Sequence, residues 1–493
     1  MPGHSSKGAG QMLDLRPTLL VIGILLTTLG AAMLVPALID LQDNHTEWVV
    51  FTASSGFTLF VGVSLTMATW GRTGNLSIKQ AIILTTVSWV TLAGFAAIPL
   101  AWSRLDLSYT NAFFEAMSGL TTTGSTIITN LDEVPRGILL WRALLQWLGG
   151  IGIIVMAIAV LPMLQIGGMQ LFRMESSDTS DKILPRATQI AGSITLVYII
   201  ITLLNVFAYV VAGMGLFDAV AHSMATIATG GFSTYDASMA QFDSAAIEGV
   251  TIVFMIAGSL PFVLFLQALR GDPGALWKDS QVRFFLLLIS ISVAIAFFYL
   301  VSVSTTGVTT AFRLAAFNIV SVTTGTGYAT TDYGVWGPFA QVFFFSMMFI
   351  GGCAGSASCG IKVFRIQIIF QNVRTYIKRI AFPHGVFSTR FNNRVLPDNV
   401  SASVMSFLYL YFLCFGILSI ALNLTGLDNL TALSAAASAM ANVGPGLGPV
   451  LGPSGTYAEI SDTAKWLLSF GMLLGRLELL TVLVIFTPAF WQE

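Results

Sequence analysis

Ten apolar runs follow one another along the chain, and each is close to the length of about 20 residues that a helix needs to cross a bilayer core. The pattern therefore predicts ten membrane-spanning segments, at about 17–40, 49–70, 80–102, 138–164, 188–213, 247–269, 283–303, 338–370, 402–425 and 464–490.

A different kind of segment lies between spans three and four, five and six, seven and eight, and nine and ten. Each is a short half-apolar stretch followed by Gly, Thr and other small residues, which predicts a re-entrant half-helix and an extended loop. The four stretches align on one glycine each, separated by 107, 96 and 117 residues: Gly124, Gly231, Gly327 and Gly444. A supersecondary unit recurring at this spacing indicates a repeat architecture.

The predicted fold is an all-α polytopic membrane protein with four helix–pore-loop–helix repeats around a pseudo-fourfold pore, preceded by two extra transmembrane helices. The expected units are an N-terminal extension at 1–78 and repeats at 79–172, 173–280, 281–394 and 395–493. We expect each half-helix to start with a polar or capping residue: Asn111, Asp218, Thr309 or Thr310, and Asp428. Their C-terminal ends, which carry partial negative charge, would then converge on the membrane centre and favour a cation.

Composition excludes a soluble protein, because only 10% of the 493 residues are charged and a soluble domain carries about a quarter. Most of the 23 Lys and Arg residues lie in alternate loops, which the positive-inside rule places in the cytoplasm. The opposite loops are mildly acidic and would attract cations. The three cysteines do not make a disulfide framework, and the first apolar run is too long for a signal peptide.

The four loops contain the residue types that an ion-selective site needs. Glycine permits positive φ, and carbonyls at membrane depth stay unsatisfied unless an ion or water meets them. The third loop, at 323–328, is similar to a potassium-channel signature, in which carbonyl oxygens replace the hydration shell of the ion. We assign K⁺ binding to three residues of each loop: Thr122, Thr123, Gly124, Thr229, Gly230, Gly231, Gly325, Thr326, Gly327, Asn442, Val443 and Gly444. Because the loops differ in sequence, we expect imperfect symmetry and imperfect discrimination among potassium, rubidium and sodium.

A stretch of ten small residues with four glycines interrupts the eighth span and will not hold a lipid-facing helix: Gly351, Gly352, Cys353, Ala354, Gly355, Ser356, Ala357, Ser358, Cys359 and Gly360. We interpret it as a gating loop beneath the filter, with a close-packed helix crossing as the alternative. Arg476 lies mid-span, where a charge costs roughly 2.5–3.5 kcal/mol, so we expect it to face the pore and repel cations. The alternative is a structural role, paired with Glu478 or with loop carbonyls.

Four other polar residues receive structural interpretations. Glu115 and His222 lie within half-helices and are expected to form hydrogen bonds in the scaffold behind the filter. Lys362 and Arg365 follow the gating loop and are expected to anchor the next helix at the cytoplasmic interface.

Seven stretches carry a family resemblance: FFEAMSGLTTTGST (113–126), LLQWLGGIGIIVMAIAVLPML (144–164), GGMQLF (167–172), HSMATIATGGFSTYDAS (222–238), GGCAGSASCGIKVFR (351–365), NVGPGLG (442–448) and GRLELLTVLVIFTPAFW (475–491). Together they closely resemble the TrkH-type subunit of the bacterial Trk potassium-uptake system, which is grouped with KtrB and the plant HKT transporters. The resemblance covers essentially the whole chain, including the two extra N-terminal helices.

This resemblance implies potassium uptake across the bacterial inner membrane through four filter loops, with a gating loop and a pore-facing arginine at the positions assigned above. It further implies a homodimer with one pore per protomer and a cytosolic TrkA-like partner whose RCK/KTN domains bind nucleotide. No organic cofactor or nucleic acid is expected on this chain. Two departures stand out: Gly325-Thr326-Gly327-Tyr328 replaces the frequent Thr-Ala-Gly-Phe, which removes one oxygen ligand, and Ser358-Cys359 replaces a glycine-richer run.

Other classes of protein fit less well. A membrane enzyme would need an intramembrane catalytic constellation, and the sequence contains no HExxH motif, paired mid-span Asp or facing Ser/Lys pair. The glycine-rich stretch at 444–448 follows a short pore helix rather than a strand, so it does not indicate nucleotide binding. A secondary cation symporter coupled to protons or sodium remains the alternative function.

Overall fold

The structure, a computed structural model, describes residues 14–71, 77–159, 183–391, 394–453 and 455–492. In these ranges the chain is helical apart from its loops and one short hairpin, in which β1 (Arg390–Phe391) pairs antiparallel with β2 (Arg394–Val395). Seven described helices are long and apolar enough to cross a membrane, or up to nine if two bent pairs each count as one span. The all-α, multi-pass prediction is therefore confirmed.

Two membrane spans precede the repeats, as predicted. The first combines α1 (Arg16–Ala32) with α2 (Leu34–Gln42), and the second is α3 (Glu47–Thr69). The buried carboxylate of Asp40 accepts a hydrogen bond of 2.7 Å from the backbone N–H of Gly137, at the positive end of α7. This contact ties the N-terminal extension to the first repeat.

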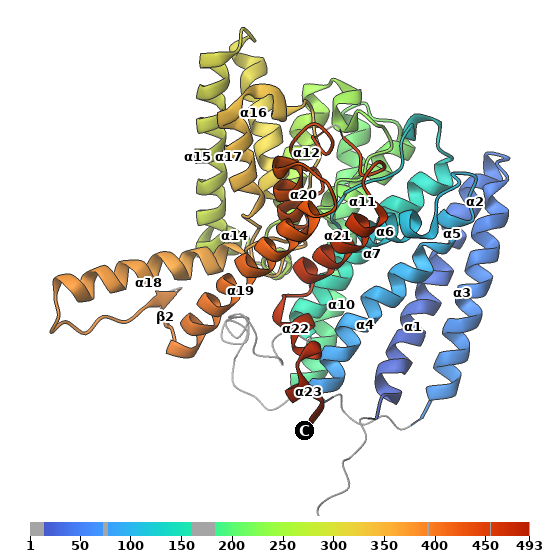
Figure 1. Cartoon of the computed structure of the whole chain (residues 1–493), viewed down its shortest axis with the longest axis horizontal. Coiled ribbons are helices and arrows are strands. Elements are labelled where there is room, and N and C mark those ends of the chain that lie inside the picture. The colour runs from blue at the N-terminus through green and yellow to red at the C-terminus, as the bar shows by residue number, and fades with distance from the viewer. Residues whose placement is uncertain (1–13, 72–76, 160–182, 392–393, 454, 493) are drawn as a thin grey trace, which may run out of the picture.

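Each repeat contains an outer span, a pore helix, a loop and a second span (Figure 1). Repeat 1 comprises α4 (Ile78–Ala96), α5 (Ile98–Ala101), α6 (Tyr109–Leu120), η1 (Leu131–Glu133) and α7 (Arg136–Ala159). Repeat 2 comprises α10 (Ile183–Val211), α11 (Leu216–Ile227), η2 (Ser238–Phe242), α12 (Ala245–Gly258), α13 (Phe262–Leu269) and α14 (Ala275–Lys278). Repeat 3 comprises α15 (Ser280–Val303), α16 (Val308–Thr323), η3 (Tyr333–Trp336), α17 (Pro338–Met348) and α18 (Val363–Ala381), followed by the hairpin. Repeat 4 comprises α19 (Asp398–Asn423), α20 (Asn429–Ala441), α21 (Asp462–Arg476), α22 (Leu480–Leu483), η4 (Val484–Phe486) and α23 (Pro488–Gln492).

The unit boundaries at 78, 280 and 394 stay predictions, and the one at 172 lies outside the described residues.

The pore helices α6, α11, α16 and α20 form the core of the molecule. In α6 every residue from Ala112 to Leu120 is buried, whereas only 28% of the most apolar stretch of α15 or α19 is buried inside the chain. A helix that is covered on all sides must be surrounded by protein, and a span that is mostly uncovered presents its apolar face to lipid. The spans therefore enclose the pore helices.

The starts of the pore helices differ in part from the prediction. Asp428 caps α20 as expected, because its carboxylate accepts a hydrogen bond of 3.2 Å from the Thr431 N–H. The other three predictions were wrong by two or three residues, since α6 begins after Ser108, α11 after Gly215 and α16 after Gly307. Each helix begins where the chain reverses direction after the preceding span; at that point serine caps as well as Asn or Asp, and glycine about as well as Thr.

Three of the predicted spans are broken helices. The eighth is interrupted after α17, as expected, but the sixth and tenth were predicted as continuous and are bent by 96° and 112°. At the sixth, Pro261 removes a backbone donor between α12 and α13. At the tenth, Glu478 has a left-handed φ of 59°, which ends the helix after Arg476.

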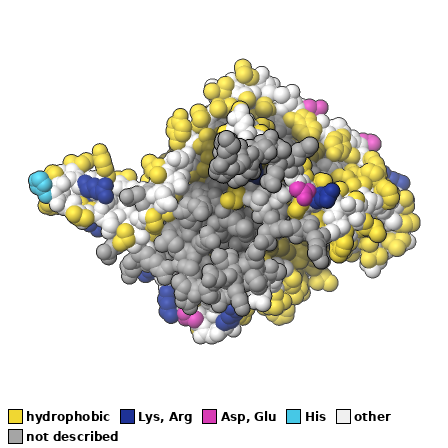
Figure 2. Space-filling view, turned by 90° about the horizontal axis from the view of Figure 1, so that it is seen from below, with side chains coloured by type: hydrophobic (Ala, Val, Ile, Leu, Met, Phe, Trp, Pro, Cys, Tyr) yellow, Lys and Arg dark blue, Asp and Glu magenta, His cyan; other side chains and the backbone are white. Residues whose placement is uncertain are grey.

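The long helix α18 and its hairpin project sideways from the body, at the left of the view and below α15 (Figure 1). α18 carries basic side chains in its last turn, Lys378 and Arg379. Seen from below, Figure 2 shows hydrophobic side chains along the flanks, lysine and arginine side chains on the projecting arm, and both basic and acidic side chains on the rim.

Candidate functional site

The chain makes the same turn at the end of all four pore helices. The residue just before each aligned glycine donates its N–H to the carbonyl five positions back, at 2.8–3.0 Å: Thr123 to Ser118, Gly230 to Ala225, Thr326 to Ser321 and Val443 to Ser438. Each acceptor is one of the last four carbonyls of its helix, which have no partner within the helix, and the shared bond fixes how the loop leaves it. The four loops are therefore conformational equivalents despite their different sequences.

Within each loop, left-handed residues alternate with residues of negative φ. Positive φ occurs at the glycine and at the residue two before it: Thr122 (53°) and Gly124 (87°), Thr229 (52°) and Gly231 (74°), Gly325 (73°) and Gly327 (81°), and Asn442 (53°) and Gly444 (103°). Such alternation orients successive peptide groups alike. A left-handed threonine costs about 1–2 kcal/mol, and strain of this kind concentrates at functional sites. The first two loops carry this strain at Thr122 and Thr229, whereas the third has Gly325 there and the fourth has Asn442, a residue type that tolerates a left-handed φ.

The loops close into a ring. A Cβ on Gly124 would lie 2.2 Å from the carbonyl oxygen of Gly230, and the same pattern continues around the molecule: Gly231 to Thr326 at 1.8 Å, Gly327 to Val443 at 1.9 Å, and Gly444 to Thr123 at 2.6 Å. Each glycine thus lies against a carbonyl of the next repeat, in the order one, two, three, four and back to one. The structure brings all twelve predicted filter residues together at this ring.

The side chains at the ring supply neutral oxygens. Thr122 Oγ1 and Asn442 Oδ1 are buried and have no hydrogen-bond donor among the described residues. Asn442 Nδ2 donates to Thr123 Oγ1 at 2.8 Å, which links the fourth loop to the first. Over the described residues no group of three or more His, Cys, Asp or Glu could hold a metal ion. Uncharged oxygens at the negative ends of four helices suit a monovalent cation.

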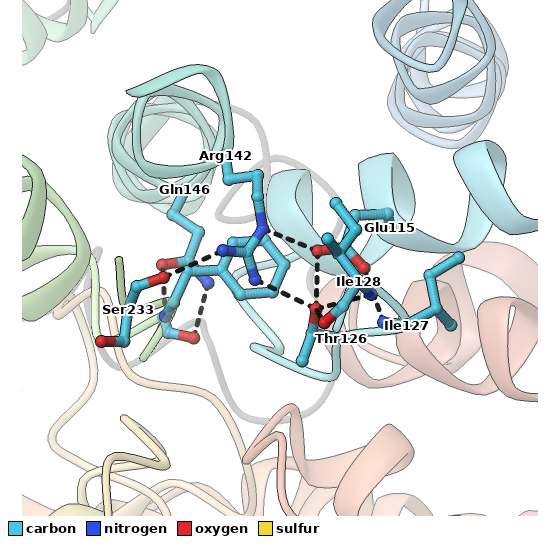
Figure 3. Close-up of polar contacts among 9 residues, drawn as sticks. Glu115, Thr126, Ile127, Ile128, Arg142, Gln146 and Ser233 are labelled. Atoms are coloured by element: carbon cyan, nitrogen blue, oxygen red, sulfur yellow. Dashed lines mark hydrogen bonds and ion pairs between the residues drawn. The ribbon is translucent and has the colours of Figure 1, made fainter. Parts of the chain in front are cut away.

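A buried ion pair supports the first two loops from behind (Figure 3). Arg142 on α7 donates to Glu115 on α6 at 2.8 Å, to Thr126 Oγ1 at 3.0 Å and to the Ser233 carbonyl at 2.9 Å. Glu115 also accepts the Ile127 N–H at 2.8 Å. The side chains of Arg142 and Glu115 are 1% and 0% exposed, so the pair is removed from water and depends on these bonds. The predicted scaffold role of Glu115 is confirmed.

His222 has the corresponding role in the second repeat, again as predicted. Its ring nitrogens contact the Asp218 carbonyl at 2.9 Å and Ser233 Oγ at 3.0 Å, and the side chain is fully buried. Tyr328 from the third loop donates to the His222 carbonyl at 3.3 Å. The histidine therefore lies behind the ring and contacts the second loop through the side chain of Ser233.

The glycine-rich stretch of the eighth span is an ordered loop inside the protein. It occupies the bend of the sixth span: Cys353 N–H donates to the Ser259 carbonyl at 2.9 Å, Ala357 N–H to the Gly258 carbonyl at 3.1 Å, and Phe262 N–H to the Gly355 carbonyl at 3.1 Å. The backbone groups that the two broken helices leave free satisfy each other, which explains how both breaks are tolerated within a membrane.

Arg476 contacts this loop from the break in the tenth span. One guanidinium nitrogen lies 3.0 Å from the Ala357 carbonyl and 2.6 Å from Cys359 Sγ, and the other donates to the Gly149 carbonyl of α7 at 3.1 Å. The side chain is buried, and it bridges the third repeat to the first. Of the two structural alternatives, contact with loop carbonyls is present, whereas Glu478 pairs with a different arginine.

That arginine is Arg365, and its predicted position was wrong. It is buried, forms an ion pair with Glu478 and lies 3.7 Å from the ring centroid of Phe407. Lys362 is partly buried and donates to the Ser358 carbonyl of the loop. Neither residue is an interfacial anchor, because α18 starts inside the protein and only later reaches the surface. A cavity of about 30 Å³, with room for about one water, lies between the loop and Arg476.

Sequence reasoning missed Arg142 and Gln146 as neighbours of the ring. The signal was present, since both are polar and stand four residues apart in an otherwise apolar span, so they share one helix face. Polar residues within a span face protein rather than lipid.

The fold and the ring define an integral membrane protein with four re-entrant loops around one axis. The family model of TrkH, described as a cation transport protein, matches residues 47–493. The chain belongs to this TrkH family.

Named relatives extend along nearly the whole chain. The Trk system potassium uptake protein TrkI of Halomonas elongata is 44% identical over 97% of both chains. The potassium uptake protein TrkH of Vibrio parahaemolyticus is 38% identical over 98% of this chain and all of its own. The crystal structure of the potassium transporter TrkH from Vibrio parahaemolyticus superposes with a TM-score of 0.90 at 36% identity, covering 97% of this chain and 100% of that chain.

Proposed function

We propose that this chain takes up potassium across the bacterial inner membrane through the ring formed by its four loops. The observation that carries the proposal is the cyclic packing, in which each glycine lies against the carbonyl oxygen of the next loop. Neutral oxygens replace the hydration shell of a monovalent cation without trapping it. The names of the relatives, potassium uptake proteins of Trk systems, support the same ion. K⁺ would be coordinated by residues 122–124, 229–231, 325–327 and 442–444.

The loop at 351–360 is proposed to be the gate below the ring, and Arg476 the electrostatic barrier beside it. The cavity between them is too small for a hydrated ion, and the guanidinium would repel a cation that reached it. The loop is held by three backbone hydrogen bonds to the bend of the sixth span, each worth about 1 kcal/mol, and by side-chain bonds to Gln281, Lys362 and Arg476. Breaking these bonds would free the loop without unfolding the spans.

The chain is further proposed to act as a homodimer, one pore per protomer, with a cytosolic TrkA-like partner whose RCK/KTN domains bind nucleotide. Family membership supports both proposals. The arm of α18 offers a place for such contacts, because it projects from the body and combines exposed apolar side chains with basic ones.

The proposal is tested by tracer flux of potassium into liposomes that contain the purified protein, with its nucleotide-binding partner added. The wild type is compared with a variant shortened within 351–360. Potassium flux in the wild type that rises on shortening the loop supports both the transport function and the gate. Equal flux in two well-folded proteins would exclude the gate, and absence of potassium flux in both would exclude potassium uptake. Independence from proton and sodium gradients would exclude the symporter alternative.

A further inference from the structure

The second spans of the repeats share one position directly behind the ring. A Cβ on Gly149 would lie 1.9 Å from the Leu120 carbonyl oxygen, and Gly258 and Gly475 have the equivalent contacts with Ile227 at 2.8 Å and Met440 at 2.1 Å. Each of these carbonyls comes four residues before a ring glycine, so the three glycines are structural equivalents. In the third repeat, Gly351 follows the ring glycine at a similar spacing in the sequence, but a Cβ there would meet the Cys359 carbonyl oxygen instead of the pore helix.

Three residues before this glycine, three repeats carry a methionine and the first carries a glutamine. Met255, Met348 and Met472 are fully buried, and so is Gln146. The fourfold pattern is thus broken by one amide group. A buried amide is costly unless its donor and acceptor are both satisfied, so its presence among three methionines needs an explanation.

Both ends of the Gln146 amide are bound to the filter loop of the next repeat (Figure 3). Nε2 donates to the Gly230 carbonyl at 2.6 Å, and Oε1 accepts the Phe232 N–H at 3.0 Å. Gly230 is the member of the ring that lies against Gly124. Within the described residues, the equivalent carbonyls of Thr123, Thr326 and Val443 accept no hydrogen bond.

We propose that Gln146 is a positioning residue that sets the preference of the ring for potassium over sodium; this inference rests on the proposed function. A smaller ion is coordinated well only if the ring carbonyls move inward. Among the four carbonyls of the residues that precede the ring glycines, the Gly230 carbonyl is the one in the described residues that a side chain holds back. One residue further along its own loop, the Gly444 carbonyl accepts from Ser125 and Tyr457 instead. Gly230 has no side chain to restrain its backbone. Gln146 therefore opposes contraction of the ring at one of its four corners, and the oxygen keeps a second lone pair for the ion.

To test this, Gln146 is replaced by methionine, the residue at the corresponding position of the other three repeats. Gln146→Met keeps volume and burial and removes both hydrogen bonds, and Met255→Leu, at the equivalent position of the second repeat, is the matched control. The ratio of potassium to sodium flux is measured in proteoliposomes for both variants and the wild type. Loss of one restraining hydrogen bond should lower this ratio roughly 3- to 10-fold in Gln146→Met and leave it unchanged in Met255→Leu.

The same proteins are also compared by the protection that potassium and sodium give against thermal unfolding in detergent, which does not require conduction. A potassium-to-sodium flux ratio that is the same in Gln146→Met and the wild type would overturn the inference. If Gln146→Met does not conduct, the same ratio of thermal protection by potassium and by sodium in the two proteins would overturn it. Equal shifts in both variants would also overturn it, because they would reflect general repacking. A wild type that carries no potassium would overturn the proposed function itself, a different result from a conducting wild type with an unaltered Gln146→Met.

Discussion

Substitution of Gly231 by alanine tests the ring closure more directly than any other change. A Cβ there would lie 1.8 Å from the Thr326 carbonyl oxygen, whereas real Cβ atoms are essentially never found closer than 3.0 Å to a neighbour, so the third loop must retreat by about 1 Å. The substitution also adds about 1–2 kcal/mol of strain, because φ is +74°. Displacement of a coordinating oxygen by this amount should reduce potassium flux roughly 10- to 100-fold, by analogy with misplaced groups at other sites.

Gly213→Ala is the matched control. Its φ is +98°, so it carries the same kind of backbone strain, but a Cβ at this position would meet nothing within 4 Å. Thermal unfolding should show a similar loss of stability from backbone strain in the two variants, and potassium flux in liposomes should fall only in Gly231→Ala. If Gly231→Ala conducts as well as Gly213→Ala, the glycine serves the turn alone and not the contact between repeats.

Three further predictions follow from single contacts. Arg476→Ala should raise potassium flux several-fold, since it removes both the charge and the bonds to the loop and α7; tracer flux measures this. Glu115→Ala should cost about 3–5 kcal/mol of stability, because it leaves Arg142 charged and buried, and thermal unfolding in detergent measures this. Asp428→Ala should cost about 0.5–2 kcal/mol by removing the cap of α20. Hydrogen bonds from Thr431 hold the pKa of Asp428 below its usual value, so the cap is intact at neutral pH and its contribution is lost as the pH falls through that lowered pKa.

Each of the predictions for Arg476, Glu115 and Asp428 has a result that would contradict it. Unaltered flux in Arg476→Ala, with the variant monodisperse, would mean that the guanidinium is a structural bridge only. A Glu115→Ala protein as stable as the double variant Glu115→Ala/Arg142→Met would show that the arginine finds other compensation. For Asp428, Asn is the control, since it caps without titrating; acid sensitivity that is the same in Asn and Asp proteins would assign the effect to another group.

The sequence determined the architecture because membrane spans and repeats are local signals. Runs of about 20 apolar residues have few alternatives to a transmembrane helix. Four glycine-centred loops at near-constant spacing indicated the repeats and most residues of the candidate site. Glu115 and His222 were correctly placed in the scaffold, since a polar residue within a pore helix must find a partner in protein. The filter, gate and barrier roles remain predictions from this pattern.

Contacts between repeats were decided only by the tertiary structure. The sixth span contains Pro261 and the tenth contains Arg476 and Glu478, yet only the tertiary structure shows that both spans bend at these residues. It also shows that the loop at 351–360 satisfies the backbone groups freed in the sixth span, and that Arg476 reaches the Ala357 carbonyl of this loop. Arg365 was expected at the interface, yet it pairs with Glu478, 113 residues away in the chain. In the sequence, Gln146 is a polar residue in a largely apolar helix. Only the structure shows that its amide donates to the carbonyl of Gly230, which lies 84 residues further on. Hydrophobic length acts along the chain and can be read from it, whereas hydrogen bonds and charge pairs act over about 3 Å and depend on which segments folding brings side by side.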